Sequence, residues 1–387
     1  MNIREEIRGR IPRNHFVRGT LSRYRVRTIN KMLINSEERE ACEIDAKRKH
    51  ELISSCLKKP TKDLLITRDK AFAAVNKLDS SVDKEKLLED MVFCRLAYGF
   101  SVDEYIAFSL QDKKQSVRAS YVSDLVRIRY HCRMNDLADA SLFNDKYKAY
   151  VFFKEYYGRE AILIGKSSDY DKFQGFIKKH PTIVKKPLFD SLGRSVELIS
   201  INDCGQTEEK IFNDLISKGK HIIEEKIEQS SELARFNTSS VNTVRVVTFQ
   251  TREGVEVPYC ILRMGRKGSF VDNGGAGGII ACVDYASGKV ITDGYDEVGG
   301  VYKNHPDSNE TVKNTQLPDW NQLCILCENA AKKTDTVKFI GWDLAHTSYG
   351  WIIVEGNAGC QLIGQQTITG GILEKIQSIE ERMDLIY

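Results

Sequence analysis

The sequence has no apolar run near the roughly 18–20 residues that a membrane-spanning helix needs. It also has almost no excess charge, because 57 basic residues face 54 acidic residues and leave a net charge of +3. This balance gives no reason to expect nucleic acid as the main partner. The first residues, MNIREEIRGRIPR, are charged throughout and lack the pattern of a secretory signal. We therefore expect a soluble globular protein.

The ten cysteines show no disulfide-framework spacing, so we expect reduced thiols in a cytoplasmic protein. Cys324 and Cys327 form the only CxxC pair, and no second pair follows to complete a zinc site. The seven histidines are scattered, and none accompanies a serine or cysteine in a nucleophile motif such as GxSxG. The sequence thus gives little support to covalent hydrolase chemistry.

One local charge bias is present at the N-terminus, where residues 1–31 carry nine Lys/Arg against two Glu. Ile3, Ile7 and Ile11 recur every four residues and form one apolar stripe on a short helix. Two interpretations stay open. The segment is either a surface helix docked by that stripe or a basic arm that touches an anionic membrane or a polyanionic substrate.

The chain changes character near residue 140. Before it, apolar residues at three- and four-residue spacing predict helices over 37–57, 84–98, 102–109 and 121–133, with Ser101 and Asp103 or Glu104 capping the third. After residue 160, short segments rich in Val, Ile and Thr predict strands over 161–165, 182–187, 196–201, 221–227, 241–250, 257–264, 278–284, 338–345 and 351–357. Further helices are expected at 169–179, 207–218, 320–334 and 371–385. The expected fold class is α+β with largely antiparallel sheets, in a domain over 141–387 that follows an all-helical domain over 1–140.

The last two strands form an expected hairpin, GWDLAHTSYGWIIVEGN, with its turn at 346–350. Strand alternation predicts that Trp351, Ile353, Glu355 and Asn357 share one face, which Asp343 of the opposing strand can reach. Two carboxylates and an amide on an apolar sheet are ligands that Mg²⁺ prefers. The alternative is that each acid caps a strand end or pairs with a basic residue.

Three other segments carry charge at the ends of expected elements. Lys186 ends an apolar strand beside a polar loop with a single glycine, which is one way to hold a polyphosphate. Lys146 opens a helix in the segment NDKYKAY, and the apolar strand HII runs into Glu224 and Glu225. Each segment alone is equally typical of a solvated element end.

Taken in order, these segments resemble the ATP-grasp superfamily over residues 144–360. The acid followed by a dozen residues and Glu-x-Asn matches its metal-binding pattern. The chain also resembles the sugar-transfer-associated ATP-grasp family, and the motifs that carry this resemblance are LAYGF (96–100), LFNDKY (142–147), SVNTVRVVTF (240–249), RMGR (263–266), SFVDN (269–273), GWD (341–343) and LPDW (317–320).

The resemblance implies an ATP-grasp fold and a role for each matching residue. Within the domain over 141–387, it implies a lid and ATP-lysine subdomain over 141–230 and a metal-binding subdomain over 231–387. For ATP, the resemblance implies phosphate binding by Lys146 and Lys186, a closing lid with Ser191 and Gly193, an adenine hinge of Glu224, Glu225 and Ile227, and ribose binding by Glu232 or Glu228. For the reaction, it implies Mg²⁺ binding by Asp343, Glu355 and Asn357, and stabilisation of the transferred phosphoryl group by Arg245 and Arg263. Two departures are the single glycine of the lid and the run Gly274-Gly275-Ala276, which leaves a substrate role there open.

The function implied by the resemblance is an ATP- and Mg²⁺-dependent carboxylate–amine ligase of capsular or exopolysaccharide biosynthesis. It would form an amide through an acyl phosphate, from a carbohydrate-linked carboxylate such as a uronic acid and an amino acid or amine. A sugar kinase using the same ATP site is the alternative, and a nucleotide-binding protein without turnover is a third interpretation. The acceptor, the amine and the oligomeric state are not indicated.

Overall fold

The computed structural model describes residues 15–79, 81–189, 196–203, 205–272 and 277–386, and their contacts divide them into two compact units. The helical unit contains residues up to 137 together with 251–253 and 361–386. The α+β unit contains residues 138–250 and 254–360. Within the described residues, no helix is long and apolar enough to cross a membrane.

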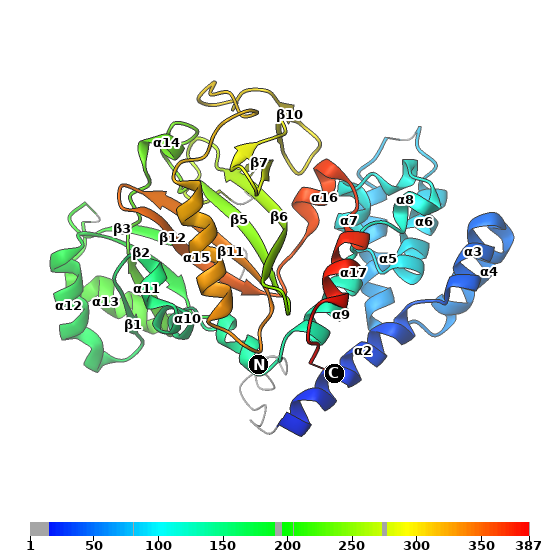
Figure 1. Ribbon diagram of the computed structural model, residues 1–387, viewed down its shortest axis with the longest axis horizontal. Helices are drawn as coiled ribbons and strands as arrows, with labels where there is room; N and C mark the ends of the chain where they lie inside the picture. Colours follow the sequence, from blue (N-terminus) through cyan, green and yellow to red (C-terminus); the bar gives the residue numbers. More distant parts are fainter. Residues whose placement is uncertain (1–14, 80, 190–195, 204, 273–276, 387) are drawn as a thin grey trace. The chain divides into compact units, whose positions relative to one another are not determined.

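The helical unit confirms most of the expected helices and adds others (Figure 1). Its main helices are α2 (His15–Met32), α3 (Ser36–Ile44), α4 (Ala46–Lys58), α5 (Lys62–Val75), α6 (Lys84–Tyr98), α7 (Val102–Ala107), α8 (Gln115–Arg118), α9 (Asp124–Met134), α16 (Ile363–Thr369) and α17 (Leu373–Glu381). The single helix expected over 37–57 is two helices, because the Asp45 side chain accepts the N–H groups of Lys47 and Arg48 and starts α4. The stripe of Ile3, Ile7 and Ile11 lies outside the described residues.

The C-terminal segment belongs to the helical unit, whereas the sequence placed it in the catalytic domain over 141–387. The buried Gln366 side chain of α16 explains the difference, because it bonds both main-chain groups of Val122. Its Oε1 accepts the Val122 N–H at 2.8 Å, and its Nε2 donates to the Val122 carbonyl at 3.1 Å. No local sequence pattern reports a contact across 244 residues.

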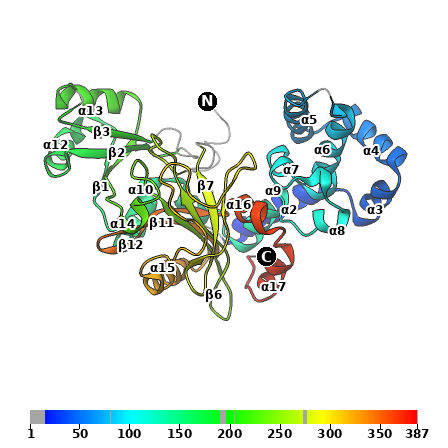
Figure 2. The same ribbon diagram turned by 90° about the horizontal axis from the view of Figure 1, so that it is seen from above.

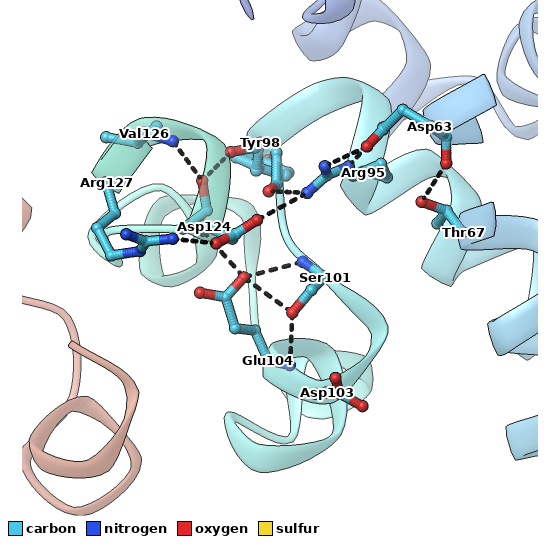
Figure 3. Close-up of polar contacts among 12 residues, drawn as sticks. Asp63, Thr67, Arg95, Tyr98, Ser101, Asp103, Glu104, Asp124, Val126 and Arg127 are labelled. Carbon is cyan, nitrogen blue, oxygen red and sulfur yellow. Dashed lines mark hydrogen bonds and ion pairs between the residues drawn. The ribbon is translucent and has the colours of Figure 1, made fainter. Parts of the chain in front are cut away.

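A buried polar network joins α6, α7 and α9 (Figure 3). The predicted cap of α7 is present as a capping box, with the Ser101 side chain on the Glu104 N–H and the Glu104 side chain on the Ser101 N–H. The same Glu104 oxygen accepts the N–H of Asp124 at 3.0 Å. Arg95 of α6 joins the network through an ion pair with Asp124 at 3.8 Å, and it also binds both oxygens of Asp63 on α5.

The α+β unit contains two antiparallel sheets, as the sequence predicted. The four-stranded sheet has the order β1-β4-β2-β3, from β1 (Ala161–Ile164), β2 (Thr182–Pro187), β3 (Glu197–Ser200) and β4 (His221–Glu225). Helices α12 (Tyr170–Lys179) and α13 (Glu208–Ser217) lie on one side of it (Figure 2) and bury Phe173, Phe212 and Leu215 with Ile183 and Ile223. These two helices do not cover the opposite side of the sheet.

The larger sheet runs β10-β9-β7-β6-β5-β11-β12, and five of its strands match predicted segments. Its strands are β5 (Thr243–Gln250), β6 (Val255–Met264), β7 (Ile279–Asp284), β8 (Lys289–Val290), which pairs with β7, β9 (Gly294–Tyr295), β10 (Val301–Tyr302), β11 (Phe339–Thr347) and β12 (Gly350–Ala358). Helix α15 (Trp320–Lys332) crosses one face, as Figure 1 shows, and buries the core there. Shorter helices, α10 (Lys146–Phe152), α11 (Lys154–Tyr157) and α14 (Ser231–Ala234), complete the unit.

Candidate functional site

Three charged residues form a row across the large sheet. Arg245 of β5 is the direct cross-strand partner of Asp343 of β11, and Asp343 is the direct partner of Glu355 of β12. Their strand neighbours Val244, Val246, Trp342 and Leu344 belong to the core under α15. Because successive side chains of a strand point to opposite faces, the row lies on the face away from α15.

A β-bulge at Val354 determines this arrangement. Asp343 pairs with Glu355 but Leu344 pairs with Ile353, which leaves Val354 without a partner on β11. Trp351 and Ile353 therefore face the core, while Glu355 faces the row with Asp343. The prediction that Trp351, Ile353, Glu355 and Asn357 share one face is wrong. It assumed that side chains alternate regularly along the strand, and the extra residue Val354 shifts this alternation by one. Asn357, which pairs with Gly341, lies on the same face of β12 as Glu355.

Two arginines hold Asp343. Arg245 donates from Nε to Oδ1 and from Nη2 to Oδ2 at 2.8 Å, and Arg263 Nη1 lies 3.2 Å from Oδ1. Burial acts to raise the pKa of Asp343, but the two guanidinium groups lower it below its usual value. Arg263 also bonds Thr243 and Asp272 at 3.0 and 2.9 Å. The predicted catalytic arginines thus lie together on the face of the predicted metal ligands.

A small cavity opens beside this row, and Lys146, Lys186, Glu224 and Glu355 are among its lining residues. Lys146 begins α10, where Asp145 caps the helix by accepting the N–H of Lys148. Burial and the charge of Asp343 raise the pKa of Glu355, although Lys146, Lys186 and Arg245 oppose the shift. The structure therefore brings both predicted phosphate-binding lysines to the predicted metal carboxylates.

Glu224 is a buried anion between two cations rather than an open hinge side chain. It accepts hydrogen bonds from Lys186 Nζ at 2.8 Å and Arg159 Nε at 3.0 Å. Burial acts to raise the pKa of Glu224, and Arg159 and Lys186 lower it. At the next residue, the Glu225 N–H donates to the Glu160 carbonyl at 3.0 Å, so this N–H is already engaged within the protein. The hinge role of Glu225 and Ile227 stays a prediction.

The remaining predicted residues lie at the edges of the site. Glu232 is exposed on α14, and Glu228 is exposed beside Lys226, so the geometry does not choose between them for ribose. Ser191 and Gly193 of the predicted lid lie outside the described residues, as does the run over 274–276. His346 faces the core and bonds Ser230 and Asp319.

The donor set fits magnesium better than a transition metal. Among the described residues, no three His, Cys, Asp or Glu side chains come together as a metal-binding group. Paired carboxylates from Asp343 and Glu355, with the Asn357 amide on the same face, suit a cation that takes one or two carboxylates and completes its shell with phosphate and water. The surrounding lysines and arginines suit those phosphate oxygens.

Sequence reasoning missed Arg159 altogether. Its guanidinium is buried and contacts Glu224 as well as the carbonyl oxygens of Ile353 and Val354. The segment around it, YYGRE, shows no periodicity and no motif that separates this arginine from the many basic residues of the surface. These contacts are visible only in the folded chain.

Comparisons with known proteins identify the family of the chain. The sequence model of the sugar-transfer associated ATP-grasp family matches residues 125–381. A search of curated proteins finds no matching relative. Among solved structures, the fold is similar to D-alanyl-alanine synthetase A from Vibrio cholerae, with 10% identity, a TM-score of 0.40, and coverage of 63% of this chain and 67% of that one.

Two further structures are similar at the same level. The ATP-grasp ligase PsnB, complexed with a minimal precursor, has 12% identity and a TM-score of 0.41, with 71% of this chain and 75% of that chain covered. N5-carboxyaminoimidazole synthetase from Staphylococcus aureus, complexed with ADP, has 10% identity and a TM-score of 0.43, with 65% and 55% covered. The family assignment itself rests on the match over 125–381, which spans well over half of the chain. The chain belongs to the sugar-transfer-associated ATP-grasp family and is an ATP-grasp enzyme.

Proposed function

We propose that this enzyme is an ATP- and Mg²⁺-dependent carboxylate–amine ligase that forms an amide through an acyl phosphate. We further propose that it joins an amino acid or amine to a uronic acid of a capsular or exopolysaccharide, as its family suggests. The observation that carries the proposal is the charge row of Arg245, Asp343 and Glu355, with Lys146 and Lys186 beside it. Such an arrangement suits phosphoryl transfer, which relies on positioning and charge stabilisation.

The ion pairs of the carboxylates in the site favour an acceptor that is already an anion. Asp343 is held by two arginines, and Glu224 is held by Arg159 and Lys186. Within the described part of the site, no ion pair holds Glu355, and the proposed metal would bind it. A hydroxyl acceptor needs a base to remove its proton, whereas a carboxylate acceptor does not. This difference supports the ligase over the sugar kinase.

The proposed reaction assigns a task to each group. A carboxylate oxygen of the acceptor bonds to the γ-phosphorus of ATP while the bond to the ADP oxygen breaks. An amine nitrogen then bonds to the acyl carbon, phosphate leaves, and the amine gives up a proton. Lys146 and Lys186 would neutralise the phosphates, Arg245 and Arg263 would stabilise charge on the transferred group, and bound Mg²⁺, held by Asp343, Glu355 and Asn357, would act as a Lewis acid toward the phosphates.

A product assay tests this proposal. The purified enzyme is incubated with ATP, Mg²⁺ and a panel of uronic acids and amines, and ADP, free phosphate and acceptor products are measured by chromatography and mass spectrometry. We expect free phosphate to appear in equal amount to ADP and amide, only when both an acid and an amine are present. Phosphate retained on the acceptor would instead identify the kinase. ATP binding without any turnover over the panel would favour the third interpretation, a nucleotide-binding protein.

A second part of the proposal concerns the N-terminal region. Helix α2 contains no acidic residue, and its exposed side chains include Arg23, Arg27 and Lys31 on one side. The opposite side buries Val26 with Cys132 and Leu137, next to α9. A basic surface on a docked helix is typical of contact with anionic lipid. We propose that it holds the enzyme near a membrane that carries the acceptor.

A further inference from the structure

Arg159 lies where the small sheet approaches β12 of the large sheet. Arg159 is 7% exposed, and its guanidinium carbon lies 4.7 Å from the centre of the Tyr157 ring. A charge buried to this degree is costly unless all of its hydrogen-bonding groups are satisfied. The contacts of Arg159 meet that requirement.

The guanidinium contacts four separate acceptor groups. On one side, Nε and Nη2 both lie 3.0 Å from Oε2 of Glu224. On the other side, Nη1 donates to the carbonyl of Ile353 at 2.7 Å, and Nη2 donates to the carbonyl of Val354 at 2.9 Å. The carbonyl of Tyr157 accepts a further bond from Nη1 at 3.2 Å. Arginine has five N–H donors in a fixed plane, so these contacts use the whole group.

The two β12 carbonyls belong to the bulge. Val354 is the residue without a cross-strand partner, and Ile353 is the last residue before the change of register. A bulge disrupts the local ladder, so its polar main-chain groups need partners from elsewhere. Arg159 supplies them, and it thereby stabilises the conformation that turns Glu355 toward Asp343.

The carboxylate of Glu224, which Arg159 contacts, also contacts a predicted ATP-binding lysine, Lys186. Oε2 of Glu224, which accepts from Arg159, also accepts from Lys186 Nζ at 2.8 Å. The Lys186 side chain is 12% exposed and the Glu224 side chain 4% exposed, so neither end is screened by bulk water. The position of Lys186 is therefore coupled to Arg159 through one shared oxygen.

Gly158 lets the chain come close enough for these contacts. It has a φ of +55°, and a Cβ there would lie 2.4 Å from Cγ2 of Ile352 on β12. Any side chain at 158 would push the segment away from the strand and would also strain the backbone. Glycine at 158 and arginine at 159 thus act together on the bulge.

We propose that Arg159 is a positioning residue that couples the ATP-binding Lys186 to the metal-binding end of β12. The proposal rests on the nucleotide and metal site proposed above and goes beyond it, because Arg159 acts through Glu224 and the bulge rather than on a substrate. Its loss would misplace Glu355 and Asn357 on one side and Lys186 on the other. Lysine cannot replace it, because one ammonium group cannot reach acceptors on two strands in a plane.

The test compares Arg159→Lys with Arg118→Lys. Arg118 of the helical unit is a matched control, since it is 6% exposed and also binds a carboxylate, Asp90, and main-chain carbonyls. Binding of a non-hydrolysable ATP analogue is measured by calorimetry as a function of Mg²⁺ concentration, with the folded fraction of each variant fixed by circular dichroism. We expect Arg159→Lys to raise the Mg²⁺ concentration at half-saturation about 10- to 100-fold, as for residues that orient metal ligands. Arg118→Lys should leave it unchanged.

A purely structural role would lower the folded fraction of Arg159→Lys without changing the Mg²⁺ dependence of what remains, and that result would overturn the proposal. If Arg159→Lys does not fold, Glu224→Gln tests the same chain of contacts from its other end. It removes the charge that holds Lys186, so we expect weaker analogue binding, and unchanged binding would again overturn the proposal. Wild-type enzyme that binds the analogue with Mg²⁺ but forms no amide would refute the ligase and leave the Arg159 comparison valid. Wild-type enzyme that does not bind the analogue would refute both.

Discussion

Asp343 on β11 is the direct cross-strand partner of both Arg245 on β5 and Glu355 on β12. The central acid is thus attracted by an arginine on one side and repelled by a carboxylate on the other. Its pKa is lowered, and that of Glu355 is raised. A bound divalent cation would favour the charged form of both acids.

The first prediction concerns these two acids. Asp343→Asn and Glu355→Gln keep the size of each side chain but remove the charge that the proposed Mg²⁺ needs. We expect each change to lower ATP-dependent phosphate release about 100-fold or more, the effect of losing one preorganised electrostatic group. The measurement is steady-state phosphate release over a range of Mg²⁺ concentrations.

The control for this prediction is Asp319→Asn. Asp319 lies near the same hairpin, but it contacts His346, whose side chain is on the core side of β11. Normal turnover in the Asp343→Asn and Glu355→Gln double variant would reject the metal assignment.

Much of the large sheet could be predicted from the sequence, but its decisive irregularity could not. The apolar residues of 339–347 and 350–358 indicated two strands, and Arg245, Asp343 and Glu355 were identified together from their motifs. The bulge at Val354 leaves no trace in GWIIVEGN, because the four consecutive apolar residues at 351–354 fit a strand with or without an extra residue. Its carbonyl groups are bonded by Arg159, which is remote in sequence and carries no local signal. The bulge, and not the spacing of apolar residues, determines which face of β12 carries Glu355 and Asn357. Its hydrogen-bond partners are known only from the folded structure.

The helical unit shows the same division between local and distant causes. The cap formed by Ser101 and Glu104 was predicted correctly, since its two members lie three residues apart. The docking of α16 was not, since the bonds between Gln366 and Val122 depend on the tertiary fold.

The second prediction separates two neighbouring lysines of β2. Lys186 bonds Glu224 and lines the cavity, whereas Lys185 points to the other face and bonds Glu197 at 2.7 Å. We expect Lys186→Met to raise the KM for ATP about 10- to 100-fold, because a charged hydrogen bond is worth about 1.5–3 kcal/mol. Lys185→Met should leave this KM near the wild-type value. Equal effects of the two changes, measured by steady-state kinetics, would contradict the role of Lys186.

The third prediction concerns the basic side of α2. Arg23→Glu with Arg27→Glu reverses two exposed charges without touching the buried Val26. We expect binding to vesicles that contain anionic lipid to fall about 10-fold or more, because each basic residue near such a surface contributes about 1 kcal/mol. Co-sedimentation with vesicles at low and high salt measures it.

The matched control for α2 is Arg68→Glu with Lys70→Glu, which makes the same charge change on the exposed side of α5. If both double variants lose binding equally, net charge rather than α2 explains the contact. Turnover of a small soluble acceptor should be unchanged in both, because neither changes the ATP site.

The fourth prediction concerns the buried carboxyl of the helical unit. Burial raises the pKa of Glu104 from 4.5 to about 7, although the N–H groups of Ser101 and Asp124 oppose the shift (Figure 3). Between these pH values the folded state keeps a proton that the unfolded state loses, so stability falls as pH rises from about 4.5 to 7 and is constant above it. At 1.36 kcal/mol for each pKa unit, the difference amounts to about 3 kcal/mol.

Glu104→Gln removes this titration and retains an oxygen that can accept the same N–H groups. We expect its stability relative to wild type to improve by about 3 kcal/mol between pH 4.5 and pH 8. Hydrogen exchange of the α7 and α9 amides, followed by mass spectrometry, measures the change in this unit alone. Asp103→Asn is the control, because Asp103 is the exposed neighbour and pairs only at 3.5 Å with Lys70. A constant difference between wild type and Glu104→Gln across this range would show that the Glu104 carboxyl does not titrate as its burial requires.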